Sequence, residues 1–136
     1  MIFWRISRHR ALSGAGGLRA AGRWHHAGNP IVYLAASPAE ALLEVCVHTS
    51  ASDIPPEYTL QKIEGPATQA AATIRITNLP PDWRDNPELT RDTGTAWLER
   101  GGSVLLKVPS AIVPETANWL FNPLHRRAAE FRIVAA

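Results

Sequence analysis

A chain of 136 residues with 46% hydrophobic side chains has room for one hydrophobic core and is short for two. Its single cysteine, Cys46, excludes a disulfide within the chain, and no cysteine–histidine spacing resembles a zinc site. The net charge of +2 is uneven, because residues 1–39 hold five arginines and no acid, whereas the remainder carries nine bases against twelve acids. We therefore expect one domain over residues 1–136, in a reducing cytoplasm, with an anion-binding amino end.

The basic N-terminal segment does not read as a targeting signal. Arg5, Arg8 and Arg10 interrupt the region where a signal peptide needs an unbroken apolar run, and no later run approaches the length of a membrane span. The segment also lacks lysine and any helix-turn-helix pattern, which ranks a nucleic-acid partner below a small phosphate-bearing ligand. A solvated basic face, or a surface for an acidic partner, remains an alternative.

The first half of the chain predicts two strands and a helix. Residues 2–6 and the β-branched, aromatic run at residues 31–35 are typical of strands, and a glycine- and alanine-rich turn region separates them. Ser37 with Glu40 three positions later matches a capping box, and Pro38 suits the first position of a helix. We expect the apolar face of this helix to consist of Leu42, Leu43, Cys46 and Val47.

The second half predicts mainly antiparallel strands around one further helix. Alternating polar and apolar residues predict half-exposed strands, and a glycine is expected just past a helix end. The expected elements are strands at 58–63, 72–77, 104–108 and 131–134, a loop at 78–83, and a helix from Asn86 to Gly101. This order favours a compact α+β domain built on a mostly antiparallel sheet with a few helices.

Three functional groups fall on adjoining elements of this plan. Gly22 permits a tight turn before Arg23, whose guanidinium can bind a phosphate or carboxylate through two parallel hydrogen bonds. Tyr33 lies on the strand that follows, and Glu44 lies about two turns into the helix. An arginine, an aromatic ring and a carboxylate together suit an anionic, aromatic ligand that contains ribose.

With these residues placed, later residues complete a family pattern. They are residues 108–114, which include Ser110, then Asn118, and the Asn-Pro-Leu-His stretch at 122–125. Together they resemble the RES domain, the toxin half of bacterial toxin–antitoxin pairs, over nearly the whole chain. The family name denotes an arginine, a glutamate and a serine, which fall here at Arg23, with Arg5 the second candidate, and at Glu44 and Ser110. After His125 the chain departs from the family, with two arginines in place of proline and aspartate.

The resemblance implies a fold like that of ADP-ribosyltransferases, NAD+ as substrate, and no metal. Glu44 would stabilise the sugar cation formed as the nicotinamide–ribose bond breaks, and Tyr33 would stack on the nicotinamide ring. Arg23 would hold the pyrophosphate or the nicotinamide ribose, and Ser110 would bond the ligand or Glu44. The residues expected to complete the ligand site are Arg5, Trp24, Asn122 and His125.

The resemblance also implies partners. It predicts a cognate Xre-like helix-turn-helix antitoxin that covers the active site, and homo-oligomers within that complex. The acceptor of the cleaved group stays open between water, inorganic phosphate and a protein side chain. Two other functions also stay open, namely a noncatalytic interaction protein with a degenerate RES domain and a nucleic-acid-binding toxin that uses residues 5–26.

Overall fold

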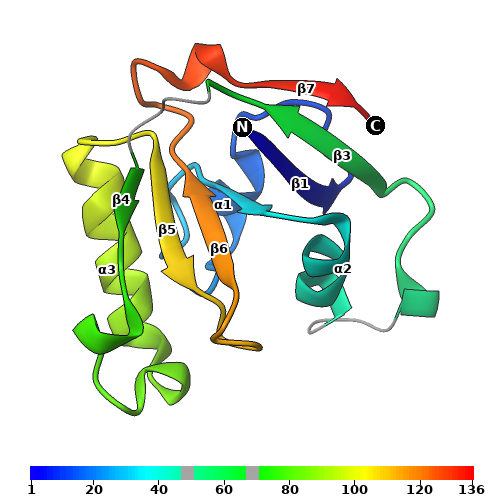
Figure 1. The fold of residues 1–136 in the computed structure, drawn as a ribbon. Coiled ribbons are helices and arrows are strands. Elements are labelled where there is room, and N and C mark those ends of the chain that lie inside the picture. Colours follow the sequence, from blue (N-terminus) through cyan, green and yellow to red (C-terminus); the bar gives the residue numbers. More distant parts are fainter. Residues whose placement is uncertain (47–50, 67–70) are drawn as a thin grey trace.

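A seven-stranded mixed sheet organises the molecule in the computed structural model, which describes residues 1–46, 51–66 and 71–136 (Figure 1). The strand order is β4-β5-β6-β2-β1-β3-β7, and neighbouring strands are antiparallel except for the parallel pair β4 and β5. The strands are β1 (Ile2–Ser7), β2 (Val32–Ala35), β3 (Thr59–Glu64), β4 (Ala71–Thr73), β5 (Leu105–Pro109), β6 (Ala117–Phe121) and β7 (Arg132–Ala135). The helices are α1 (Ala15–Arg19), α2 (Pro38–Cys46) and α3 (Pro87–Arg100). The expected α+β class with a mostly antiparallel sheet is confirmed.

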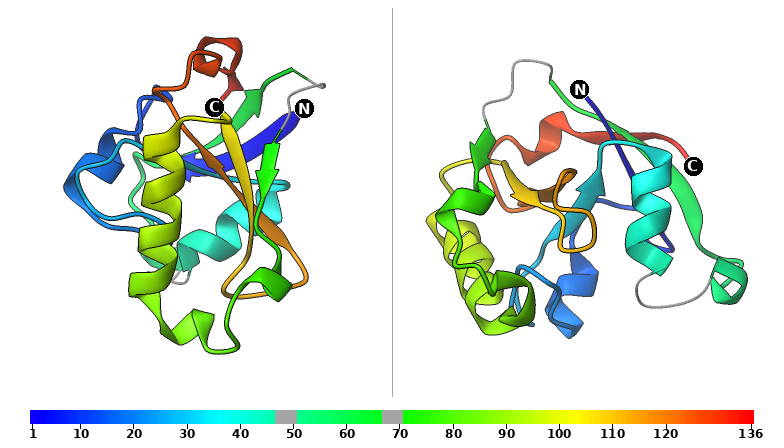
Figure 2. Two further views of the ribbon diagram at one scale, coloured as in Figure 1. Left: turned by 90° about the vertical axis from the view of Figure 1, so that its left-hand side faces the viewer. Right: turned by 60° about the horizontal axis from the view of Figure 1, so that its bottom comes forward.

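Alternation along the central strands builds a core on each face of the sheet. On β5, Leu106 and Val108 pack with the tryptophans under α3, whereas Leu105 faces the other way. On β6, Leu120 joins the α3 side and Phe121 joins the opposite core. Because side chains in a strand point alternately to opposite faces, both faces are buried at the centre of the sheet. Figure 2 shows α3 running along one side of these strands.

Helix α2 begins as expected but packs differently. The Ser37 hydroxyl accepts a hydrogen bond from the Glu40 amide at 3.2 Å, and the Glu40 carboxylate accepts one from the Ala36 amide. The expected apolar face is wrong for the described residues, because the side chains of Leu42, Leu43 and Cys46 are exposed. The small side chain of Ala41 is buried instead, since the helix lies close to β1 and β2. Val47 lies outside the described residues.

Helix α3 matches the sequence prediction at both ends. The Asn86 side chain accepts a hydrogen bond from the Leu89 amide, and Pro87 occupies the first helical position. Gly101 ends the helix with φ of 62°, a left-handed conformation that favours glycine. The helix carries Trp97 into the core beneath it.

Three parts of the fold differ from the sequence prediction. The turn region before Gly22 contains the short helix α1, and residues 76–78 form a 3-10 turn where a strand was expected. Strand β4 is only three residues long and pairs parallel to β5, which leaves no room for the predicted antiparallel strand at 72–77. Strand β6 was not predicted at all, although it pairs with both β2 and β5.

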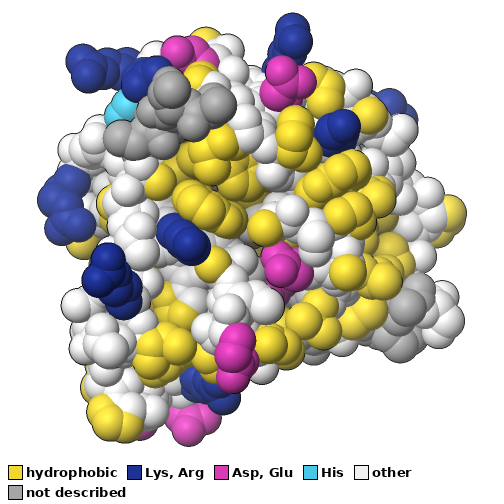
Figure 3. All heavy atoms as spheres, viewed as in Figure 1, with side chains coloured by type: hydrophobic (Ala, Val, Ile, Leu, Met, Phe, Trp, Pro, Cys, Tyr) yellow, Lys and Arg dark blue, Asp and Glu magenta, His cyan; other side chains and the backbone are white. Residues whose placement is uncertain are grey.

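The surface carries hydrophobic side chains on the face seen in Figure 1, bordered by lysines and arginines (Figure 3). The ammonium of Lys107 lies 5.5 Å from the ring centre of Trp119, and Trp119 meets the buried ring of Phe3 edge to face. Within the described ranges, none of the helices is long and apolar enough to cross a membrane.

Candidate active site

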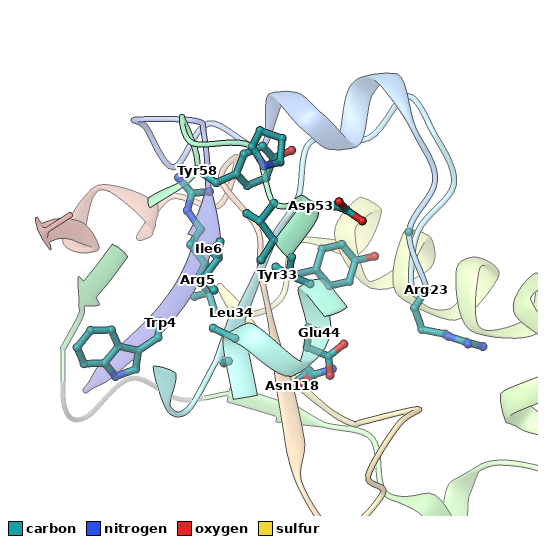
Figure 4. Close-up of a pocket in the computed structure, with 16 residues that line it drawn as sticks. Trp4, Arg5, Ile6, Arg23, Tyr33, Leu34, Glu44, Asp53, Tyr58 and Asn118 are labelled. Atoms are coloured by element: carbon teal, nitrogen blue, oxygen red, sulfur yellow. The ribbon is translucent and has the colours of Figure 1, made fainter. Parts of the chain in front are cut away.

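A cleft of about 570 Å³ opens where β1 and β2 part (Figure 4). In the described part of the chain these strands pair only at Trp4 and Ala35, so the sheet separates beyond that point. Helix α2 and residues 53–58 form the remaining walls. The volume lies in the usual range for small-molecule sites. The polar side chains that line the cleft are those of Arg5, Arg23, Tyr33, Glu44, Asp53, Tyr58 and Asn118.

Glu44 enters the cleft from α2 with its carboxylate held in place. Its Oε1 accepts hydrogen bonds from Asn118 Nδ2 at 2.9 Å and from Ser110 Oγ at 3.2 Å. Both donors are buried, and both bind the same oxygen. Two fixed donors orient the carboxylate without neutralising its charge, which is the arrangement needed to face a developing cation.

Ser110 supports Glu44 and is not placed as a nucleophile. Its hydroxyl oxygen accepts hydrogen bonds from the amides of Ile112 and Val113, at 3.1 and 3.2 Å, and therefore directs its own proton to Glu44. The side chain is fully buried and is not among the groups that line the cleft. Of the two roles expected for this serine, bonding the ligand or bonding Glu44, the geometry favours the second.

Tyr33 and Arg23 stand on the side of the cleft opposite β1. The Tyr33 ring enters the cleft from β2 with its hydroxyl directed towards the Arg23 turn (Figure 4). Burial raises the pKa of this phenol, so it is neutral at physiological pH. Arg23 is exposed at the rim, where its Nη1 donates to the carbonyl oxygen of Arg84 at 2.8 Å. Arg23 therefore offers a charge at the entrance of the cleft.

Arg5 supplies a buried charge inside the cleft. Its guanidinium donates to Gln61 Oε1 and to the carbonyl oxygens of His9 and Ala11. Burial lowers the pKa of Arg5 to about 10, which still leaves it cationic at neutral pH. Arg5, Tyr33 and Tyr58 also line an adjoining hollow of about 480 Å³. Arg5, the second candidate for the arginine of the family pattern, thus lies deeper in the cleft than Arg23, the first candidate.

Three residues expected in the ligand site lie elsewhere. Trp24 is 1% exposed and packs in the core beneath α3, with its ring centre 6.0 Å from that of Trp83. Asn122 is buried and donates to the carbonyl oxygen of Leu98. His125 accepts a hydrogen bond at Nδ1 from the Arg127 amide. These contacts stabilise the chain locally, and none of the three side chains reaches the cleft.

Sequence reasoning gave no role to four groups near the site, although Asn118 is part of the family pattern. Asp53 and Tyr58 line the cleft from the segment before β3, and Asn118 reaches it from β6, the strand that was not predicted. Arg91 of α3 donates from Nε to the carbonyl oxygen of Gly22 at 2.9 Å and so fixes the turn before Arg23. Polar residues at strand ends are a weak signal, because their neighbours become known only with the sheet order.

His26 has two carboxylate neighbours that its spacing in the sequence does not reveal. His26 Nε2 lies 2.6 Å from Asp92 Oδ1 and 3.8 Å from Glu88 Oε1, both on α3. The two carboxylates are largely solvent-accessible, and the His26 side chain is half-buried. The contact ties the Arg23 turn to α3 at the surface, as does the bond from the His26 amide to Thr95 Oγ1.

Comparisons with known proteins agree on one family. The family model described as RES domain matches residues 2–136. A protein of Pseudomonas putida KT2440 named Toxin Res is 49% identical over 135 residues, covering 98% of this chain and 92% of that protein. The Prs ADP-ribosylating toxin of Sphingobium sp. YBL2 is 39% identical, covering 90% and 83% respectively. Among solved structures, the Mycobacterium tuberculosis MbcT–MbcA toxin–antitoxin complex contains a chain of the same fold, with a TM-score of 0.78 at 21% identity, covering 98% of this chain and 81% of that one.

Proposed function

The chain belongs to the RES-domain family, and on that premise we propose that it is the toxin of a toxin–antitoxin pair, an enzyme that cleaves the nicotinamide–ribose bond of NAD+. The observation that carries this proposal is the Glu44 carboxylate, oriented by two donors in a cleft that also holds Tyr33, Arg5 and Arg23. A fixed carboxylate, an aromatic ring and two cations match the cationic sugar, the pyridinium ring and the pyrophosphate of one dinucleotide.

The proposed chemistry follows from the charges that change during the reaction. As the bond between ribose C1′ and the nicotinamide nitrogen breaks, its electron pair stays on the nitrogen and the ring becomes neutral. The positive charge moves to the ribose, where Glu44 stabilises it. Tyr33 attracts the pyridinium in the ground state and loses that attraction as the bond breaks, so it positions the ring more than it accelerates the step. Arg5 and Arg23 would hold the pyrophosphate oxygens.

The acceptor attacks C1′ through an oxygen or nitrogen atom and gives up its proton. Water, inorganic phosphate and a protein side chain all fit this step. The relative named as a Prs ADP-ribosylating toxin supports testing a protein acceptor beside the other two. Mass spectrometry of the products, with and without phosphate and with a bacterial lysate as protein source, identifies the acceptor.

The decisive experiment removes only the charge of Glu44. Glu44→Gln keeps the size of the side chain and its contact with Asn118, and we expect it to lower NAD+ turnover by at least about a thousandfold. The matched control is Glu99→Gln, which removes an exposed carboxylate on α3, and we expect this variant to keep full activity. Full turnover in Glu44→Gln, or intact NAD+ at high concentrations of the wild-type protein, would refute the proposal.

We propose further that an Xre-like helix-turn-helix antitoxin covers this cleft and that the complex contains more than one copy of the toxin. An enzyme that consumes NAD+ would harm its host unless a partner closed the site. Co-expression with the protein of the neighbouring reading frame should restore cellular NAD+ and growth. Light scattering of the purified complex gives its stoichiometry.

A further inference from the structure

His25 is the histidine that the proposed function leaves unused. It is 2% exposed and lies two residues after Arg23. His25 lines the adjoining hollow but not the cleft, whereas Tyr33 lines both. A histidine with both ring nitrogens buried must satisfy each of them within the protein. The hydrogen bonds of His25 therefore show which groups it holds in place.

The neighbours of Nδ1 determine the tautomer of His25. The amide of Gly22 lies 3.2 Å from Nδ1 and 3.1 Å from the carbonyl oxygen of His25, and it donates to both when Nδ1 carries no proton. The Tyr33 hydroxyl lies 2.7 Å from the same nitrogen and must donate to it. The ring proton is then on Nε2, which faces the carbonyl oxygen of Gly17 at 3.3 Å. In this neutral form each of these polar atoms has a partner of the correct kind, whereas a proton on Nδ1 would leave the proton of the Tyr33 hydroxyl without an acceptor among these groups.

The same contacts fix the backbone on both sides of Arg23. The Gly22 amide binds His25 Nδ1, and the Trp24 amide donates to the Tyr33 hydroxyl at 3.1 Å. The approach is so close that a Cβ on Gly22 would overlap the Tyr33 hydroxyl. The histidine and the tyrosine thus form one hydrogen-bonded pair that holds the turn.

We propose that His25 is a positioning residue of this active site: through Tyr33 Oη it orients the ring that lines the cleft, and through the Gly22 amide it sets the direction of Arg23. This inference rests on the proposed function, because it assigns a role in the binding of NAD+. Burial lowers the pKa of His25 more than its contacts with the backbone of Gly17 and Ala20 raise it, and nearby Arg91 and His26 add to the lowering, which favours the neutral form that the pair requires.

Two substitutions separate the two ends of the imidazole. In His25→Asn the side-chain oxygen takes the place of Nδ1 and can still accept a hydrogen bond from the Tyr33 hydroxyl. In His25→Gln the longer side chain extends towards Gly17 and loses the hydrogen bond with Tyr33. We expect His25→Gln to lower kcat/KM for NAD+ about tenfold, mainly through a higher KM, and His25→Asn to stay within about twofold of wild type. Equal losses in both variants would overturn the proposal.

A double-mutant cycle tests whether the effect passes through the tyrosine. Tyr33→Phe removes the hydroxyl and should cost about as much as His25→Gln, and the double variant should be no worse than either single one. Losses that multiply would mean that His25 acts independently of Tyr33. Thermal melting of each variant shows whether it is folded.

A spectroscopic measurement decides the case if His25→Gln does not fold. In the wild-type protein at neutral pH, the ring ¹⁵N shifts of His25 should show an unprotonated Nδ1 and a protonated Nε2, and a proton on Nδ1 would overturn the proposal. This readout does not depend on turnover. If the wild-type protein shows this tautomer but leaves NAD+ intact, the proposed enzymatic activity is refuted, whereas the hydrogen bond between His25 and Tyr33 is supported.

Discussion

At the scale of single residues, the charge on Glu44 depends on the neutrality of its neighbour Asn118. Replacing Asn118 with Asp would set a second carboxylate where a donor now lies 2.9 Å from Glu44 Oε1. The two carboxylates would share a proton, so we expect NAD+ turnover to fall about tenfold or more near pH 6 and to recover as the pH rises and the pair loses that proton. The measurement is a pH profile of kcat/KM.

Asn118→Ala is the control for this prediction. It removes the donor without adding a charge, so its loss of activity should be the same factor at every pH. A loss in Asn118→Asp that does not change with pH would contradict the electrostatic account and leave only the missing hydrogen bond.

Residue types alone identified Arg23, Tyr33 and Glu44, because each follows a recognisable turn, strand or helix signal, and the structure places all three around one cleft. Sequence could not rank Arg5 against Arg23, because the burial of Arg5 depends on its hydrogen bond to Gln61, which is distant in sequence, and on the path of the loop that brings the carbonyl oxygens of His9 and Ala11 to its guanidinium. Trp24 illustrates the opposite error. It adjoins Arg23 in sequence, but its side chain is buried in the core beneath α3.

At the scale of elements, α3 must approach the turn before β2 closely, and Gly94 allows it. A Cβ at position 94 would overlap the carbonyl oxygen of Trp24. Gly94→Ala should therefore destabilise the protein by about 3 kcal/mol, because the clash outweighs the roughly 1 kcal/mol that alanine gains in a helix. Chemical denaturation measures the change. Gly102→Ala, which meets open space, should leave stability nearly unchanged, and a neutral Gly94→Ala would show that α3 shifts at little cost.

The elements with strong local signals were predictable, and those fixed by their neighbours were not. Helix α3 has a cap residue, an N-terminal proline and a terminal glycine within its own sequence. Turn residues flank strand β6, with Pro114 before it and Asn122-Pro123 after it, but they do not mark the residues between them as a strand. Its identity as a strand comes from pairing with β2 and β5 on both sides. Among the described residues, strand β4 pairs only with β5, and the chain turns away at residues 76–78.

At the scale of the whole molecule, the uneven charge of the chain should steer an anionic dinucleotide to the cleft. Arg8, Arg10 and Arg19 are exposed and lie beside residues that line the hollow next to the cleft. Replacing all three with glutamine should lower kcat/KM for NAD+ at low salt by a few-fold and weaken its dependence on salt, because fewer charges are left to screen. Turnover measured across a salt series tests this.

The matched control replaces Arg100, Arg126 and Arg132, which are also exposed and lie outside both hollows, and so changes the net charge by the same amount. If steering depends on where the charges lie, this variant keeps the salt dependence of the wild type. Equal effects in the two triple variants would mean that net charge alone attracts the dinucleotide, and that the arginines of the amino end serve another surface, such as the contact with the antitoxin.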